Sequence, residues 1–217
     1  MEKVNYVFFV DFDGTVTNMD ACHAMVTNLA GEGWEEINKK WENKELSTVE
    51  CARQTFKLFK RKDIEALNKI IDPITIDPTF KDLVSYCEKN QFPLYILSDG
   101  YDFYIKYLLA REGLNIPYYA NRMIFNPDLD IETPYHSSCG ICGVCKSQLM
   151  EHLQNTGTKS IYIGDGYSDF CPSKKADFVF AKSTLYKHCL AAGKEVHEFR
   201  SFGDILKILQ SLRIGRS

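Results

Sequence analysis

Three polar clusters, each placed directly after an apolar run, constrain the fold of this chain most strongly. The first run, residues 4–10, consists mainly of β-branched and aromatic side chains and ends at Asp11-Phe12-Asp13. The other two runs end at Ser98-Asp99-Gly100 and at Gly164-Asp165-Gly166. Runs of this kind are typical of strands that are buried on both faces of a parallel sheet. Because the carboxyl ends of such strands meet along one edge, the three clusters are expected to line one crevice.

Strands and helices alternate after the first strand and the segment that follows it. Apolar runs predict strands over 93–97, 160–163 and 177–180, and helical periodicity predicts helices over 80–87, 101–112, 146–154 and 202–212. Two further runs, 118–125 and 129–135, predict a hairpin. This order implies right-handed βαβ crossovers, so the predicted fold class is α/β with a doubly wound parallel sheet.

A helical insertion is predicted between the first strand and this alternating part. The pattern from about residue 18 to residue 71 is helical, and the segment is too long for a simple crossover. The helix starts are marked by typical capping residues: Ser47 with Glu50, Asp63, and Asp77 with Pro78. We therefore predict a core of residues 1–16 and 76–217 and a helical cap over 17–75.

Composition narrows the class of protein. The chain has 217 residues, 45% of them hydrophobic, which allows a sizeable core and excludes a disordered tail. No apolar run approaches the ~20 residues of a membrane helix, and a formal net charge of -3 gives no electrostatic reason to bind nucleic acid. No secretory cleavage site follows the first run, so a cytoplasmic protein with mostly reduced cysteines is expected. It is expected to act on a small molecule, as a monomer or a homodimer.

The carboxylates of the predicted crevice favour a bound cation. Asp11, Asp13 and Asp165 could not all stay ionised at close range without one. All-oxygen ligation suits Mg²⁺, which also binds phosphate oxygens. Asp11 is then a candidate nucleophile toward a phosphoryl group. Asp13 is a candidate general acid for the leaving oxygen and, afterwards, a general base that activates water against an aspartyl-phosphate.

Each cluster alone is weak evidence, because Asp and Gly are also turn residues. All three in this order, each after an apolar run, are hard to explain by turns alone. Together with Lys146 and Asp169, the segments Asp11-Phe12-Asp13-Gly14-Thr15-Val16-Thr17, Ser98 and Gly164-Asp165 resemble the four ordered motifs of the haloacid dehalogenase superfamily. The inserted helices resemble the small cap of its phosphoserine-phosphatase-like branch. The resemblance covers residues 4 to about 180 and implies a Rossmann-like core and phosphatase activity.

The resemblance also implies roles in catalysis. Asp11 would be the nucleophile and Asp13 the general acid and base. Lys146 would neutralise the phosphate and the nucleophile. Within Ser98-Asp99-Gly100, which is the expected phosphate-binding segment, the serine hydroxyl and the glycine amide would bind the phosphoryl oxygens.

The metal site follows from the same resemblance. Mg²⁺ would bind Asp11, Asp165 and the carbonyl oxygen of Asp13. Asp169 would support Lys146 or a metal-bound water. Ser168 stands where phosphoserine phosphatases have Asn, and this change is expected to weaken one water-mediated metal contact.

Departures in the predicted cap bear on the substrate. Asp20 occupies the position of the acidic residue with which phosphoserine phosphatases bind the substrate ammonium. The position of their carboxylate-binding arginine holds Thr55, while Arg53 lies two residues earlier on another helix face. Phosphoserine is therefore expected to be a poor substrate.

Two other groups of phosphatases resemble the chain more closely. The run from Cys139 through Cys142 and Cys145 to Lys146 resembles a Cys-Gly-Cys-Cys-Lys segment of the 2-hydroxy-3-keto-5-methylthiopentenyl-1-phosphate phosphatases of methionine salvage. The segment 164–172 resembles the phosphoethanolamine and phosphocholine phosphatases. The cysteine segment favours the methionine-salvage type, and the other type stays open.

The cysteines of that segment are also candidate zinc ligands. Cys139, Cys142 and Cys145, with His136 or Cys189 as a fourth ligand, could bind zinc tetrahedrally. A second, well-separated pair is missing, which favours a loop of reduced thiols that positions the lysine after it.

Two other classes of protein are alternatives to a phosphatase. A phosphorelay receiver also gathers carboxylates, a hydroxyl and a lysine around Mg²⁺, but it is about half as long and has no inserted cap. Asp13 is moreover a group suited to turnover and not to a stable phosphorylated signal. A metal-binding interaction module built on the cysteine segment is the second alternative.

Overall fold

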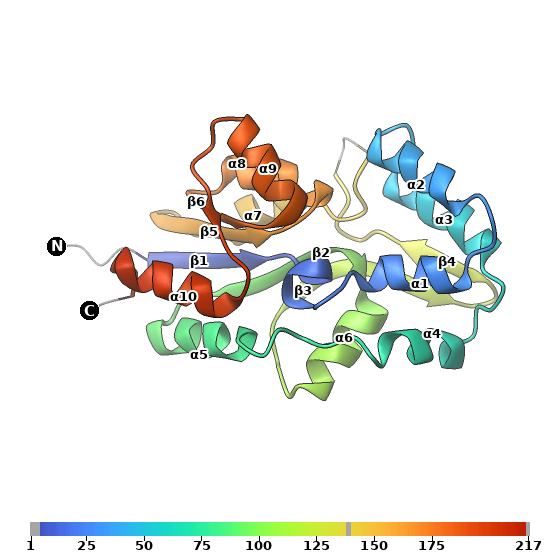
Figure 1. The fold of residues 1–217 in the computed structure, drawn as a ribbon, viewed down its shortest axis with the longest axis horizontal. Coiled ribbons are helices and arrows are strands. Elements are labelled where there is room, and N and C mark those ends of the chain that lie inside the picture. Colours follow the sequence, from blue (N-terminus) through green and yellow to red (C-terminus); the bar gives the residue numbers. More distant parts are fainter. Residues whose placement is uncertain (1–4, 138–139, 216–217) are drawn as a thin grey trace.

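The chain folds around a seven-stranded sheet with helices on both faces (Figure 1). The structure is a computed structural model and describes residues 5–137 and 140–215. The strand order is β4-β3-β2-β1-β5-β6-β7, and every neighbouring pair is parallel except β3 with β4. The strands are β1 (Asn5–Val10), β2 (Leu94–Tyr101), β3 (Tyr118–Phe125), β4 (Leu129–Glu132), β5 (Thr158–Gly164), β6 (Phe178–Ala181) and β7 (His197–Glu198). The predicted α/β class with a doubly wound sheet is confirmed, and β3 with β4 forms the predicted hairpin.

The central strand β1 is buried on both faces, which explains its apolar sequence. Phe8 and Val10 belong to the larger hydrophobic core, and Val7 and Phe9 belong to a second core on the opposite face. Helices α5 (Phe80–Asn90), α6 (Asp102–Arg111) and α10 (Phe202–Ser211) cover the first face. Helices α7 (Lys146–Leu153), α8 (Phe170–Lys175) and α9 (Ser183–Ala191) cover the second (Figure 1).

Four helices lie between β1 and α5, at one end of the sheet (Figure 1). They are α1 (Ala21–Leu29), α2 (Trp34–Glu42), α3 (Thr48–Leu58) and α4 (Ile64–Ile71). The chain leaves and re-enters the sheet region through two segments that an antiparallel bridge joins at Thr17 and Ile76. The capping box of Ser47 with Glu50 and the N-cap at Asp63 are confirmed. No helix among the described residues is long and apolar enough to cross a membrane.

Some local predictions were wrong. Helix α5 does not begin after Asp77, because the Asp77 carboxylate accepts hydrogen bonds from the Thr79 amide and hydroxyl, and the helix begins at Phe80. Strand β2 does not end at Leu97 but continues through the cluster Ser98-Asp99-Gly100, with an irregularity in its pairing with β3. Helices α8 and α9 and strand β7 were not predicted; α8 has six residues and β7 only two, too few for a readable periodicity.

Candidate active site

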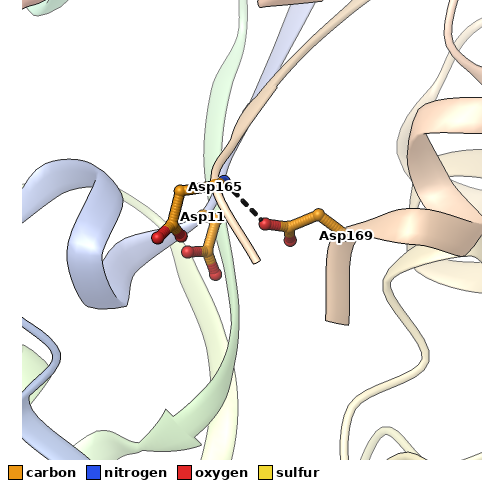
Figure 2. Close-up of side chains that lie close together, drawn as sticks. All are labelled: Asp11, Asp165 and Asp169. Atoms are coloured by element: carbon orange, nitrogen blue, oxygen red, sulfur yellow. Dashed lines mark hydrogen bonds between the residues drawn. The ribbon is translucent and has the colours of Figure 1, made fainter. Parts of the chain in front are cut away.

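The structure brings the three predicted clusters together at the carboxyl edge of the sheet. Asp11 follows β1, Asp165 follows β5, and Asp169 precedes α8. One carboxylate oxygen from each of these three residues lies within 4.8 Å of the other two, and Figure 2 shows the side chains directed toward a common space. Such a cluster of carboxylates could hold a metal ion.

Lys146 provides the positive charge that contacts this cluster. Its Nζ donates to Asp11 Oδ1 at 2.5 Å, to Asp169 Oδ1 at 2.6 Å and to Ser168 Oγ at 3.0 Å. The side chain is 1% exposed. Burial alone would lower the pKa of Lys146, but the two carboxylates outweigh it and raise that pKa, so the ammonium stays charged. A lysine at the first position of α7 opposes the helix dipole, and the two aspartates compensate for this.

Asp169 is fully occupied as a hydrogen-bond acceptor. Its Oδ1 accepts from Lys146 and, at 2.6 Å, from the Tyr162 hydroxyl. Its Oδ2 accepts from the amides of Asp165 at 2.9 Å and Gly166 at 3.0 Å, and the first of these bonds is the dashed line in Figure 2. Asp169 therefore positions Lys146 and the loop after β5, and its lone pairs are less available to a metal than those of Asp11 and Asp165.

Asp11 and Asp165 are the better metal ligands on this geometry. Burial and the neighbouring Asp169 raise the pKa of Asp11 well above its ordinary value, with Lys146 opposing them. Burial and Asp169 also raise the pKa of Asp165 to about 6, although Thr15 Oγ1 donates to its Oδ1 at 3.1 Å. Among the described residues no ion pair involves Asp165. The cluster thus carries more carboxylates than cations, and its all-oxygen donor set fits Mg²⁺.

Asp13 connects the segment after β1 to helix α1. Its Oδ1 accepts from the amide of Ala21, the first residue of α1, at 2.9 Å. Its Oδ2 accepts from the Tyr104 hydroxyl and, at 3.4 Å, from Ser98 Oγ. Burial, with a smaller contribution from Asp20, raises the pKa of Asp13 to about 7. A carboxyl group with a pKa near neutrality suits both donation and acceptance of a proton.

The contact between Asp13 and Tyr104 depends on glycine at position 100. A Cβ on Gly100 would lie 1.8 Å from the Tyr104 hydroxyl oxygen and 2.3 Å from Asp13 Oδ2. The Gly100 amide donates to Ser98 Oγ at 3.0 Å, so the predicted phosphate-binding hydroxyl and amide bond to each other here. Asp99 lies between these two residues in the sequence, and its carboxylate accepts hydrogen bonds from the Thr48 hydroxyl and from the amide of Val144.

A cavity of about 280 Å³ lies between these groups and the cap helices. The core contributes the clusters described above. The cap contributes apolar and sulfur-containing side chains, chiefly Trp34, Trp41, Phe56, Cys22 and Cys51. Among the described residues no lysine or arginine lines the cavity, whereas several acidic side chains do.

The structure places the predicted cap residues as follows. Asp20 lines the cavity, but its carboxylate caps α1 by accepting from the His23 amide at 2.8 Å. Thr55 is buried and lines the cavity. Arg53, from the same helix, does not line the cavity. Its Nε forms an ion pair with Oδ1 of Asp130, the second residue of β4, at 2.8 Å. The cavity therefore has no arginine from α3.

The candidate zinc ligands are not gathered into a metal site among the described residues. Cys139 lies outside the described residues. Cys145 immediately precedes α7, where its amide donates to the Tyr135 carbonyl oxygen at 2.8 Å. The ring nitrogen Nδ1 of His136 lies 2.7 Å from the Thr133 carbonyl oxygen. Cys142 is half-buried in the loop, and Cys189 is buried in the core between α9 and the sheet.

Sequence reasoning missed two tyrosines that contact the site. Tyr104 lies in the predicted helix over 101–112 and Tyr162 in the predicted strand over 160–163, and their hydroxyls donate to Asp13 and Asp169. Both are fully buried. The sequence signal for such a contact is a tyrosine at a core position where phenylalanine would pack equally well. A buried tyrosine hydroxyl usually has a hydrogen-bond partner.

Comparisons with known proteins agree with this geometry. The model of the family described as Putative Phosphatase matches residues 6–212. The 2-hydroxy-3-keto-5-methylthiopentenyl-1-phosphate phosphatases of Lysinibacillus sphaericus (strain C3-41), Brevibacillus brevis (strain 47) and Bacillus cereus (strain ATCC 10987) are 31%, 32% and 33% identical to this chain. These matches cover 95%, 95% and 94% of this chain and 94%, 96% and 95% of those proteins.

Solved structures show the same fold. A phospho-aspartyl intermediate analogue of phosphoserine phosphatase superposes with a TM-score of 0.73 at 23% identity, over 95% of this chain and 99% of the other. A substrate-bound phosphoserine phosphatase gives the same values. The family match spans almost the whole chain, and the motif residues lie together at one edge of the sheet. The chain therefore belongs to the Putative Phosphatase family and is a phosphatase of the haloacid dehalogenase superfamily.

Proposed function

We propose that this phosphatase hydrolyses a small phosphomonoester through an aspartyl-phosphate on Asp11 and depends on Mg²⁺. One observation carries the proposal: a buried carboxylate, Asp11, contacts the ammonium of Lys146 and lies beside Asp165. Asp13 stands two residues further on, with a pKa of about 7. Mg²⁺, bound by Asp11, Asp165 and the Asp13 carbonyl oxygen, would supply positive charge that screens the nucleophile from the phosphate.

The side chains then have separate tasks in two half-reactions. In the first, Asp11 forms a bond to phosphorus, the bond to the ester oxygen breaks, and Asp13 donates its proton to that oxygen. In the second, Asp13 takes a proton from water, whose oxygen attacks phosphorus and releases Asp11 and inorganic phosphate. Lys146 neutralises charge throughout, and Asp169 keeps the lysine in place. Ser98 Oγ and the Gly100 amide would bind phosphoryl oxygens after exchanging their mutual hydrogen bond for bonds to the substrate.

For the substrate we propose a phosphomonoester with an uncharged tail, of the 2-hydroxy-3-keto-5-methylthiopentenyl-1-phosphate type, as the names of the curated relatives indicate. The cap side of the cavity supports this. Trp34, Trp41 and Phe56 offer an apolar surface, and the thiols of Cys22 and Cys51 add polarizable sulfur. A methylthio group would be desolvated there without an unpaired charge.

A second candidate has its own supporting observation. Asp20 and Glu42 line the same cavity as the two tryptophans, and no lysine or arginine among the described residues opposes them. Carboxylates beside indole rings favour a cationic tail. Phosphoethanolamine and phosphocholine carry such a tail and remain the alternative substrates.

A panel of phosphomonoesters tests the proposal. Phosphate release is measured with Mg²⁺ and with EDTA for the methylthiopentenyl ester, phosphoethanolamine, phosphocholine and phosphoserine. We expect phosphoserine to have the lowest kcat/KM, because its carboxylate would be buried without a partner, and an unsatisfied buried charge costs several kcal/mol. Phosphoserine as the best substrate would contradict the substrate assignment, and full activity in EDTA would contradict the metal dependence.

The variant Thr55→Arg provides the matched test of specificity. Thr55 lines the cavity without charge, so an arginine there would face a substrate carboxylate. We expect the ratio of kcat/KM for phosphoserine to that for the ester with the uncharged methylthiopentenyl tail to rise at least tenfold. Arg53→Ala is the control, because Arg53 lies on the same helix but outside the cavity, and we expect no change in this ratio.

A further inference from the structure

We propose that Asp99 is a positioning residue that couples the cap helices to the loop that carries Lys146, and that it does not bind the substrate directly. The proposal applies to hydrolysis of any ester by this phosphatase. It rests on four hydrogen bonds that the Asp99 carboxylate and carbonyl oxygen accept from three groups, and on the elements from which those groups come.

One set of hydrogen bonds links Asp99 to the cap helices. Thr48, the buried first residue of α3, donates from Oγ1 to Asp99 Oδ2 at 2.9 Å. The same hydroxyl oxygen accepts from Trp41 Nε1 at 3.1 Å. An indole, a hydroxyl and a carboxylate thus form one chain that fixes the Trp41 ring, which lines the substrate cavity.

A second set of hydrogen bonds links Asp99 and Thr48 to the loop before α7. Asp99 Oδ1 accepts from the Val144 amide at 2.9 Å, two residues before Lys146. The Thr48 amide also donates to the Ile141 carbonyl oxygen in this loop, at 2.8 Å. The start of α3 and Asp99 therefore contact the loop from two sides, so a shift of the cap would also shift the residues that lead into the lysine.

Packing beneath the loop makes this arrangement specific. Asn121 on β3 is completely buried and donates from Nδ2 to the Asp99 carbonyl oxygen at 2.6 Å and to Oδ1 at 3.2 Å. A Cβ on Gly143 would lie 2.4 Å from Asn121 Oδ1, so the loop lies against the amide as closely as its backbone allows. This is a structural reason for glycine at that position of the cysteine segment.

The same geometry argues against a direct substrate contact. Both carboxylate oxygens of Asp99 already accept hydrogen bonds from uncharged donors, and no ion pair involves Asp99 among the described residues. Asp99 lines the cavity, and a substrate ammonium that bound it would have to share this carboxylate with Thr48 and the Val144 amide. By contrast, a role in positioning uses the contacts that are present.

The test uses p-nitrophenyl phosphate, which has no ammonium group, beside phosphoethanolamine, which has one. Thr48→Val removes the hydroxyl and keeps the shape, Thr48→Ser restores the hydroxyl, and Asp99→Asn replaces one carboxylate oxygen with a donor. We expect Thr48→Val and Asp99→Asn to lower kcat/KM for both esters about tenfold or more, the loss that one hydrogen bond to a charged group implies. Thr48→Ser is expected to stay within threefold of the wild-type protein. The kcat/KM of the double variant is expected to equal that of the more impaired single variant, because both changes break the same hydrogen bond.

A spectroscopic readout separates positioning from general damage. The chain has two tryptophans, so a Trp34→Phe background leaves Trp41 as the only indole. In that background Thr48→Val is expected to increase acrylamide quenching of Trp41 fluorescence, and Thr48→Ser is not. Arg53→Ala is the control, since it breaks an exposed pair between α3 and Asp130 outside the cavity and should change neither activity nor quenching. Thermal melts confirm that each variant is folded.

Three results would overturn the proposal. The first is a loss in Asp99→Asn that is confined to phosphoethanolamine while Thr48→Val stays near wild type, which would make Asp99 a substrate ligand. The second is a Thr48→Ser variant as impaired as Thr48→Val. The third is an equal loss in Arg53→Ala, which would indicate general loosening of the cap.

Discussion

Lys146 illustrates how a single buried side chain organises this site. Two carboxylates and a hydroxyl accept hydrogen bonds from its ammonium, while its own side chain is almost inaccessible to solvent. A buried ion pair of this kind contributes little net stability, but its removal leaves uncompensated charge. The residue is therefore better explained by its place beside Asp11 than by a contribution to folding.

Replacing Asp11, the proposed nucleophile, should abolish turnover without unfolding the protein. Asp11→Asn removes the carboxylate that we propose attacks phosphorus, while Lys146 keeps its bond to Asp169. We expect no multiple-turnover phosphate release and a thermal melt close to that of the wild-type protein. Rates and melts are measured on the same preparation. Measurable turnover in this variant, beyond the level of a mock purification, would exclude Asp11 as the nucleophile.

Removing the lysine should have a different signature. Lys146→Met keeps the length of the side chain but leaves Asp11 and Asp169 without their cation. We expect a loss of activity together with a loss of about 3–5 kcal/mol in the free energy of unfolding, the usual result of breaking a buried pair. Urea unfolding in EDTA measures this, with the exposed Lys69→Met as the control. Unchanged stability would show that the two carboxylates are not ionised in the folded protein.

At the scale of elements, the end of β2 and helix α6 meet through Gly100. The close approach of the Tyr104 hydroxyl and of Asp13 leaves no space for a methyl group there. Gly100→Ala is expected to destabilise the protein by about 1–3 kcal/mol through overpacking and to lower kcat by displacing Asp13. Urea unfolding and steady-state kinetics test this. Gly100→Ala combined with Tyr104→Phe should recover part of the stability, because it removes the shortest contact; no recovery would place the strain elsewhere.

At the scale of the whole molecule, a metal ion bound at the carboxylate cluster would stabilise the folded state. A ligand that binds only the folded state adds about 2.7 kcal/mol at one hundred times its Kd. We therefore expect Mg²⁺ to raise the Tm of the wild-type protein. The Asp165→Asn variant should lose most of this shift, and the exposed Glu65→Gln variant should keep it. Differential scanning fluorimetry with and without EDTA measures the shift; an unchanged shift in Asp165→Asn would remove Asp165 from the metal site.

The sequence by itself determined six of the seven strands and the positions of the main carboxylates at the ends of the strands. The run over 4–10 predicted a doubly buried strand because each of its faces packs against a separate core. The capping box of Ser47 with Glu50 and the N-cap at Asp63 were also predictable, since each is a contact between residues three apart. Asp77 shows the limit of such local signals, because its carboxylate binds Thr79 instead of starting a helix.

Only the tertiary structure decided which partners the functional side chains have. Tyr104 bonds to Asp13 across 91 positions, and Lys146 bonds to Asp11 across 135. The sequence predicted Asp99 as part of a phosphate-binding segment. In the structure its carboxylate accepts hydrogen bonds from a cap helix, from β3 and from the loop before α7. Local patterns carry no information on such pairs, because the donors reach one carboxylate only after strands and helices distant in sequence have packed together.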